Sequence, residues 1–591
     1  MLLLILFLIS FTILGYIILR YLGIDEKYFG YNDIIGTISV SFGIANIYCI
    51  LSLYILNYML RIPLHRFLVF SIFIIPALLI PSIPIKIKDR KNTGQIILEF
   101  IFLLLLFLSL LYTRFLLITP PYLIVGPDAG YHLSLSKQIL KYGITTIDHW
   151  YMGGVANIYP PGFHLFTVIA YLISNEDFIH VYNIIPGVIS IFTVLTMYTI
   201  IKRLTKSSIS SFIASVLVVY SPLMIWHLLS YFGTLYGFYL LSLSTLLFML
   251  FIEKKDKIIF ILFALSMALL FLTHTTSFIF GSLILSIVFI YQMISTDNYE
   301  LIMWLPVFLF IILPLILPWY LPLKPAFDYL IRVDNLADIH FGNASDFFMI
   351  GYSSIIFAFV GIVYALKSND NFVKSMIIVF VVFLILTNAY QTLRIRSIRE
   401  HRLITFLSFP VFILSGYGIC SLIREFNIKN ENRRYYVYLI LLIVIIAPMI
   451  LYQIDAGIKH TKTIFVYISP SELEAVEYIT SAISNCRDKV VLADDPFSGF
   501  NAWVYGLCEC RVITNGWEPN AVDRHEPIED AKMIFNPSTP DWEIKNLVRK
   551  ENIGFIILHK KNENLKKLQS LYENIFENKE MVVLSTGLCK N

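Results

Sequence analysis

The chain has 591 residues, of which 57% are hydrophobic and only 15% are charged, and its formal net charge is +4. Ordinary soluble domains carry about 25% charged residues, so the composition excludes a wholly soluble protein and predicts an α-helical polytopic membrane protein. The charge is close to neutral for this length, so we expect no nucleic-acid partner.

Apolar segments recur along the chain at the length of about 20 residues that spans a bilayer. The first segment lacks a basic start and a small-residue cleavage site, so we interpret it as an anchor and not as a signal peptide. We expect about 13 or 14 spans, near residues 1–20, 34–60, 66–83, 96–118, 178–201, 207–226, 230–252, 258–274, 276–293, 301–323, 349–367, 374–388, 403–422 and 435–453.

The spans and the fall in hydropathy after residue 453 predict four parts. They are N-terminal spans (1–118), a first outer loop with surface-lying helices (119–177), a transmembrane core with a second outer loop at 324–348 (178–453), and a soluble domain (454–591). Within the soluble domain, apolar strands near 489–494, 510–514, 553–558 and 581–585 alternate with helices near 540–551 and 562–575, which predicts an α/β fold. Ser469 and Glu472 form a capping-box pattern, with Pro470 at the first helical position.

Lys and Arg in short loops favour the cytoplasmic side. Five basic loops, at 86–91, 202–206, 253–257, 367–374 and 424–434, can all lie inside if residues 161–175 do not cross. We therefore expect 161–175 to form a helix along the outer surface, and the C-terminal domain to be extracytoplasmic. The basic loop 61–66 then lies outside if 66–83 spans, so either this loop breaks the rule or 66–83 is re-entrant.

The segment 392–402 is basic although this topology places it outside. It carries Arg394, Arg396, Arg399 and Arg402. Because guanidinium groups bind phosphate bidentately, the cluster is suited to the phosphate of an outer-leaflet lipid. The alternative is that these side chains reach ordinary anionic headgroups of membrane lipids.

The segment "VGPDAGYHLSLSKQILKYG" (125–143) places polar residues just after the fourth apolar run. If a helix starts there, Asp128, Tyr131 and His132 share one side at positions i, i+3 and i+4. Asp148 and His149 follow in the same loop, and such a set could hold a divalent cation or a polar substrate. The alternative for Asp128 is a helix N-cap.

Three segments resemble the GT-C glycosyltransferase superfamily. "DAGYHLSLSKQILKYG" resembles the first acidic motif, Asp-x-x-Tyr-His, of oligosaccharyltransferase catalytic subunits. "YPPGFHLF" (159–166) and "REHRLITFLSFPVFILSGYG" (399–418) resemble segments of the protein mannosyltransferase and aminoarabinose transferase branches. The resemblance implies a dozen or so spans, a large first outer loop and an outer C-terminal domain.

The resemblance also implies a chemistry: transfer of a sugar from a polyprenyl (dolichyl-type) phosphate-linked donor to a protein, glycan or lipid acceptor at the outer face of the plasma membrane. Asp128 would be the general base or a ligand of a divalent metal, Mn or Mg, with Asp148 at the approximate place of the second acidic motif. Arg399 and Arg402 would hold the leaving phosphate, and Tyr131, His132 and His149 would bind substrate.

Two positions depart from the oligosaccharyltransferase pattern. Ser134 stands where that family has Arg. The nearest match to its Trp-Trp-Asp-Tyr-Gly motif is "NAWVYGLCEC" (501–510), in which Ala502 and Val504 replace the first Trp and the Asp. Valine cannot accept a hydrogen bond from an acceptor hydroxyl, so we favour a less specialised transferase over one that acts on protein Asn. We interpret Trp503 and Tyr505 as core aromatic residues.

The remaining polar features have less specific interpretations. The acidic loop 324–348 is either solvated or a cover over the site, and His274 is expected to be structural. Cys486, Cys508, Cys510 and Cys589 lie in the outer domain and predict two disulfides, with a metal pair at Cys508 and Cys510 as the alternative. Two further function classes stay open, namely a carrier or flippase for lipid-linked sugars and a non-catalytic scaffold.

Overall fold

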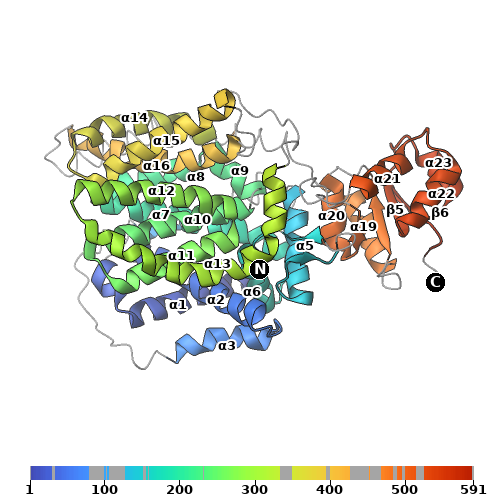
Figure 1. Cartoon of the computed structure of the whole chain (residues 1–591), viewed down its shortest axis with the longest axis horizontal. Helices are drawn as coiled ribbons and strands as arrows, with labels where there is room; N and C mark the ends of the chain where they lie inside the picture. Colours follow the sequence, from blue (N-terminus) through green and yellow to red (C-terminus); the bar gives the residue numbers. More distant parts are fainter. Residues whose placement is uncertain are drawn as a thin grey trace.

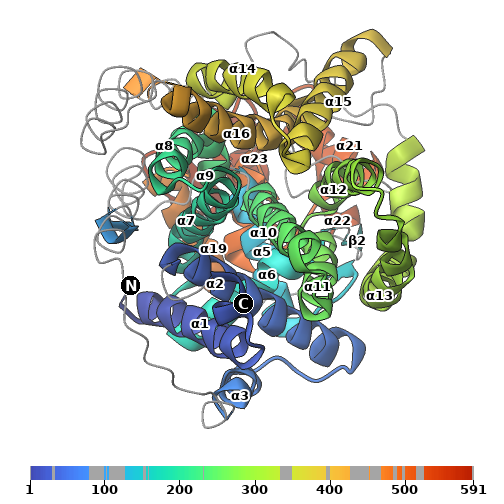
Figure 2. The ribbon, with the colours of Figure 1, turned by 90° about the vertical axis from the view of Figure 1, so that its left-hand side faces the viewer.

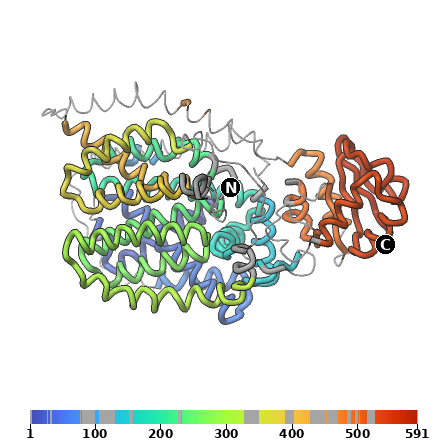
Figure 3. The backbone as a smooth tube through the Cα atoms, turned by 45° about the horizontal axis from the view of Figure 1, so that its top comes forward, coloured from blue at the N-terminus to red at the C-terminus, as the bar shows by residue number. Residues whose placement is uncertain are grey.

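The protein consists of a helical bundle and a smaller α/β domain beside one end of it (Figures 1 and 3). In this computed structural model the described residues are 2–29, 33–78, 99–101, 103–104, 127–150, 155–157, 159–230, 232–332, 349–393, 400–425, 451–452, 455, 468–482, 489–494, 499–513 and 525–588. Most of the predicted spans 96–118 and 435–453, and the basic loop 86–91, lie outside these residues.

The bundle is built from long apolar helices. In the first half of the chain these are α1 (Leu2–Tyr21), α2 (Ile34–Leu53), α3 (Arg66–Ala77), α7 (Phe178–Thr205), α8 (Ser208–Val219), α9 (Pro222–Ser230), α10 (Phe232–Lys254), α11 (Lys257–Thr273) and α12 (Thr275–Ser295). They are followed by α13 (Trp304–Arg332), α14 (Tyr352–Lys367), α15 (Asn371–Leu393) and α16 (Glu400–Glu425). Short π-helical turns, η1 (Asp25–Phe29) and η2 (Tyr54–Met59), flank α2, and a 3-10 turn, η5 (Tyr299–Met303), precedes α13.

Seven helical segments within the described residues are long and apolar enough to cross a membrane, and six apolar helices are shorter. Figure 2 shows α10 in the interior of the bundle, and almost all of its residues are buried. The expected multi-pass membrane architecture is confirmed.

One expected element is wrong in detail. The predicted span 207–226 is two helices, α8 and α9, because the residue before a proline disfavours the helical conformation and Ser221 precedes Pro222. A helix is present at the expected residues 161–175, namely α6 (Gly162–Ser174), and eleven of its thirteen residues are buried. Its expected place along the outer surface of the membrane stays a prediction.

The loops that we expect on the inner side meet at one end of the bundle. Three contacts connect them: Lys202 with Asp33 at 3.0 Å, Lys27 with Asp256, and Arg424 with the carbonyl oxygen of Thr205. The loops 202–206 and 253–257 and the start of 424–434 therefore share one end, as the positive-inside pattern predicts.

The basic loop 61–66 lies at the opposite end, beside helix α5 (Pro127–Tyr142). Asn57 Nδ2 donates to the carbonyl oxygen of Ile62 at 2.9 Å, and its Oδ1 accepts from the backbone N–H of Ile144 at 2.6 Å. The loop is thus on the same side as the first predicted outer loop and breaks the charge pattern of the other basic loops. Its helix α3 rises only about 18 Å over twelve residues, which is too short to span.

The C-terminal domain is α/β, as predicted. Its elements are α19 (Pro470–Ala482), β3 (Val490–Ala493), α20 (Gly499–Cys508), β4 (Arg511–Val512), α21 (His525–Phe535), α22 (Asp541–Lys550), β5 (Ile553–His559), α23 (Leu565–Leu571), β6 (Glu573–Glu577) and β7 (Met581–Ser585). The sheet order is β4-β3-β5-β7-β6, with β4, β3 and β5 parallel and β7 and β6 antiparallel to their neighbours. Strand β6 replaces the end of the helix expected at 562–575.

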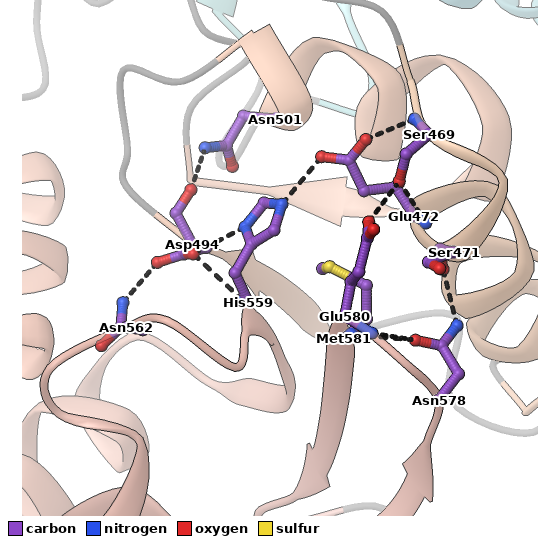
Figure 4. A network of polar contacts seen from close by, with 10 residues as sticks. All are labelled: Ser469, Ser471, Glu472, Asp494, Asn501, His559, Asn562, Asn578, Glu580 and Met581. Atoms are coloured by element: carbon purple, nitrogen blue, oxygen red, sulfur yellow. Dashed lines mark hydrogen bonds and ion pairs between the residues drawn. The ribbon is translucent and has the colours of Figure 1, made fainter.

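A polar network joins α19 to the sheet (Figure 4). The predicted capping box is present, since the Glu472 backbone N–H donates to Ser469 Oγ at 3.1 Å and the Glu472 carboxylate accepts from the Ser469 N–H. His559 at the end of β5 lies between two carboxylates, with Nδ1 2.8 Å from Asp494 and Nε2 2.8 Å from Glu472. These two hydrogen bonds, against the effect of burial, raise the pKa of His559 to about 9.

The expectation of two disulfides in this domain is wrong. Cys508 and Cys510 are buried free thiols, and Cys508 Sγ lies 3.7 Å from the carbonyl oxygen of Val476. Cys486 and Cys589 lie outside the described residues. A buried free cysteine packs as a small hydrophobic residue, and these two thiols therefore contribute to the core without forming a disulfide.

Candidate functional site

Helix α5 and the hairpin after it carry most of the residues that the sequence singles out. The helix begins at Pro127, a residue favoured at the first helical position. Asp128 therefore lies inside the first turn, where the positive end of the helix dipole favours a carboxylate. The structure describes the backbone of Asp128, and its side chain lies outside the described residues.

His132, one turn beyond Asp128, is buried in an aromatic and histidine cluster. Its Nδ1 lies 2.9 Å from Nε2 of His164 on α6, and its ring packs against Tyr159 with centroids 4.7 Å apart. Burial, and then the neighbouring His164 and His274, hold the pKa of His132 well below its usual range. His132 is therefore a neutral hydrogen-bonding group at physiological pH.

Tyr159 begins the "YPPGFHLF" segment, just before α6, and its ring packs against the rings of this cluster. Its ring also packs edge-on against Tyr131, at a centroid distance of 5.9 Å. A Cβ placed on Gly233 would lie 2.4 Å from the Tyr159 hydroxyl oxygen, so α10 approaches Tyr159 closely only because Gly233 has no side chain. The segment thus packs against α5 directly, and it brings in His164, which the sequence reasoning missed.

Asp148 is a buried hydrogen-bond acceptor that joins three segments. It lies on β1 (Ile147–Asp148), which pairs with β2 (Val155–Ala156). Gln138 Nε2 donates to Oδ1 at 2.9 Å, the Trp150 backbone N–H donates to Oδ1 at 3.2 Å, and the Tyr505 hydroxyl donates to Oδ2. Gln138 and Tyr505 were not expected in this role.

His149, the next residue, is exposed and has other ring and backbone contacts than His132. Its ring packs on Tyr142 at a centroid distance of 4.3 Å, and its backbone N–H donates to Gln138 Oε1 at 2.8 Å. The structure therefore does not bring His149 together with His132.

A divalent cation such as Mg²⁺ or Mn²⁺ binds several oxygen atoms. Among the described side chains, no group of three or more His, Cys, Asp or Glu residues could hold a metal ion. Asp148 already accepts from three donors, so it does not present a vacant carboxylate. The metal role of Asp128 and Asp148 stays a prediction.

The start of α16, which contains Arg402, is connected to α5 through one intermediate helix. Arg399 lies outside the described residues, and Arg402 lies in the first turn of α16, where only its backbone is described. Three residues further on, Thr405 Oγ1 lies 2.9 Å from Nε2 of His227 on α9, and α9 also contacts α5. The chain fold thus brings the start of α16 to the same end of the bundle as α5.

Two further expectations concern the outer turns. His274 caps α12, as its Nδ1 accepts from the Ser277 N–H at 3.2 Å, so its structural interpretation is confirmed. Residues 333–348 of the acidic loop lie outside the described residues, and 324–332 form the end of α13.

The C-terminal domain completes the site with α20, which lies beside α5 (Figures 1 and 3). Trp503 and Tyr505 are buried, as expected of core aromatic residues, and so is Val504. Tyr505 stacks on Tyr131, with ring centroids 6.1 Å apart and planes 17° apart. The "NAWVYG" segment therefore faces α5 and the interior.

Residues 40–573 match the family described as "Family of unknown function (DUF6541)". The comparison with curated proteins found no match.

Solved structures share the fold at low sequence identity. The archaeal oligosaccharyltransferase AglB from Archaeoglobus fulgidus, in complex with an inhibitory peptide and a dolichol-phosphate, matches with a TM-score of 0.55 and 12% identity, covering 78% of this chain and 69% of its own. ArnT from Cupriavidus metallidurans matches with a TM-score of 0.55 and 13% identity, covering 85% and 100%, and a second ArnT structure is bound to undecaprenyl phosphate.

The mycobacterial arabinofuranosyltransferase AftD matches with a TM-score of 0.50 and 12% identity, covering 83% of this chain and 41% of its own. AglB, ArnT and AftD are membrane glycosyltransferases of the GT-C type, so the expected GT-C architecture is confirmed as a fold. The protein is thus a multi-pass membrane protein with the GT-C fold, and the match over residues 40–573 places the chain in the family of unknown function DUF6541.

Proposed function

We propose that the protein is a membrane glycosyltransferase that transfers a sugar from a polyprenyl (dolichyl-type) phosphate-linked donor to an acceptor at the outer face of the plasma membrane. The observation that carries the proposal is the position of Asp128. It lies in the first turn of α5, at the end of a GT-C bundle where the C-terminal domain packs and where α16 begins.

In the proposed reaction the Asp128 carboxylate takes the proton of the attacking acceptor group. The acceptor atom bonds to the anomeric carbon of the sugar, and the bond from that carbon to the lipid phosphate oxygen breaks. The phosphate leaves with the electron pair, and Arg399 and Arg402 stabilise its negative charge. Burial holds the pKa of His132, one helical turn beyond Asp128, well below its usual range, so that ring is neutral.

Solved structures with a similar fold support a polyprenyl-phosphate donor by analogy. The AglB structure contains a dolichol-phosphate and an ArnT structure contains undecaprenyl phosphate. No step of the proposed reaction is assigned to a metal. If the enzyme uses a divalent ion, Asp128 and Asp148 would hold it, and it would supply neutralisation of the charge on the leaving phosphate.

The acceptor is proposed to be a glycan, lipid or protein group other than a sequon asparagine. In this chain Val504 replaces an acidic residue, and it is buried in α20. A buried valine offers no hydrogen-bond acceptor to a peptide hydroxyl. This favours a less specialised transferase over an oligosaccharyltransferase.

The test is sugar transfer in purified membranes with a radiolabelled polyprenyl-phosphate sugar. Asp128→Asn preserves shape and removes the charge, so transfer should fall by about 10²-fold or more. Transfer by Asp128→Asn at the wild-type rate would refute the catalytic assignment. Flipping of the labelled lipid in vesicles without transfer would instead indicate a carrier.

A further inference from the structure

The C-terminal domain touches the proposed active helix with backbone as well as side chains. A Cβ placed on Gly506 of α20 would lie 2.3 Å from the carbonyl oxygen of Gly130 and 3.0 Å from its Cα. Gly130 is two residues after Asp128 in the same helical turn. Because the neighbouring atoms are backbone, they cannot turn aside as a flexible side chain could.

A second set of contacts lies directly beside this one and is fully buried. Tyr505 donates its hydroxyl hydrogen to Asp148 and accepts from Gln138 Nε2 at 2.9 Å. Gln138 belongs to α5 and Asp148 to β1, so one hydroxyl joins the helix, the hairpin and the C-terminal domain. Burial, and then the negative charge of Asp148, raise the pKa of Tyr505 far above its usual range, so the hydroxyl keeps its proton.

Further contacts extend the interface along both segments. The backbone N–H of Val512, on β4, donates to the carbonyl oxygen of Trp150 at 3.0 Å. Lys137 lies 3.4 Å from the Glu509 carboxylate and 3.4 Å from the carbonyl oxygen of Leu507. The interface therefore continues through α20 and β4, and is not a single point of contact.

From this geometry we propose that α20 is a positioning element of the active site, in which Gly506 sets the position of the first turn of α5 and Tyr505 joins the same helix, through Gln138, to the Asp148 hairpin. This rests on the proposed function, because the turn so positioned contains Asp128. The two residues act through the backbone of α5 and the hydrogen bonds of Asp148, without touching substrate. The C-terminal domain is thus part of the catalytic structure.

The expected size of the effect follows from the close approach. Accommodating a methyl group at Gly506 requires the contact to open from 2.3 Å to more than 3.0 Å, a shift approaching 1 Å in the turn that holds Asp128. A displacement of about 1 Å in a catalytic group can cost about 10²-fold in rate. Removing only the Tyr505 hydroxyl takes one of three donors from Asp148 and one acceptor from Gln138, and should weaken the link between α5, the hairpin and α20.

The experiment uses the full-length protein in nanodiscs and the variants Gly506→Ala and Tyr505→Phe. Gly187→Ala is the control for the first, since a Cβ there meets nothing within 4 Å. Tyr478→Phe is the control for the second, on α19 of the same domain. Each variant is assayed for kcat and for the KM of the lipid-linked donor, and amide hydrogen exchange is measured across residues 127–142.

We expect Gly506→Ala and Tyr505→Phe to lower kcat, the first by about 10²-fold, with the donor KM changed by less than about threefold. Gly506→Ala should speed hydrogen exchange at the start of α5 and Tyr505→Phe should speed it around Gln138, and neither control should. Unchanged exchange and unchanged kcat in Tyr505→Phe would overturn the proposal, even if Gly506→Ala fails to fold. If the wild-type protein transfers no sugar, the proposed function fails, while the exchange data still decide whether α20 positions α5.

Discussion

The contact of His559 with two carboxylates makes the stability of the C-terminal domain depend on pH. The Asp494 and Glu472 carboxylates raise the pKa of His559 to about 9 from its ordinary value of 6.5. A raised folded-state pKa means that the stabilisation is fully present below pH 6.5 and is lost as the pH rises through 9. With 1.36 kcal/mol per pKa unit, the loss between pH 7 and pH 9 is about 2 kcal/mol.

This loss can be measured as hydrogen exchange of the β5 amides in the full-length protein, with the intrinsic pH dependence of exchange divided out. The free energy of opening should fall by about 2 kcal/mol from pH 7 to pH 9 in the wild type. His559→Gln should remove the slope and, at pH 7, lower the stability by a similar amount. His525→Gln, which removes a histidine at the start of α21, is the matched control.

Other groups also titrate in this pH range. Burial and the neighbouring Asp530 raise the pKa of Glu551 to about 7. Their contribution is present in both proteins, so the difference in opening free energy between wild type and His559→Gln reports His559 alone. Equal opening energies at pH 7 and pH 9 in the wild type would show that His559 is not held as an imidazolium. A slope that persists in His559→Gln would assign the pH dependence to another group.

Four further outcomes are expected. Arg402→Ala should raise the donor KM in the transfer assay, and Arg402→Lys should recover part of the loss because the charge remains; equal loss in both would indicate a purely geometric role. Because no step of the proposed reaction is assigned to a metal, EDTA should leave transfer unchanged; inhibition that manganese reverses would instead indicate that Asp128 and Asp148 hold a metal. A cysteine at position 255 should not react with a membrane-impermeant thiol reagent in intact cells. Labelling at that position would contradict the predicted topology, since it would place the loop 253–257 outside. Gly361→Ala should reduce folded protein, since its Cβ would lie 2.0 Å from the Leu414 carbonyl oxygen between α14 and α16; unchanged thermal stability would contradict that packing.

Local signals in the sequence predicted the local structure well. The capping box at Ser469 and Glu472 formed because both residues lie within one turn, where each reaches the backbone N–H of the other. The helix at Asp128 formed because Pro127 suits the first helical position. Strand β6 was missed because Glu573–Glu577 has no strongly apolar pattern, and its pairing with β7 decides its conformation.

The contacts that build the site could not be predicted in the same way. Tyr505 and Asp148 are 357 positions apart, and His132 and His164 are 32 positions apart. No periodicity links such pairs, since each depends on which helix faces which. The resemblance of "NAWVYG" to a known motif led us to interpret Trp503 and Tyr505 as core aromatic residues, and it did not indicate that Tyr505 and Gly506 contact α5.

The sequence by itself determined that this is a polytopic helical protein with a C-terminal α/β domain, because hydropathy, capping and strand patterns act over a few residues and are independent of the rest of the chain. Only the tertiary structure decided that α6 is buried, that Cys508 and Cys510 are free thiols, and that α20 packs on the turn containing Asp128. Those outcomes depend on close packing between distant segments, where the absence of a single Cβ at Gly506 allows two backbones to meet.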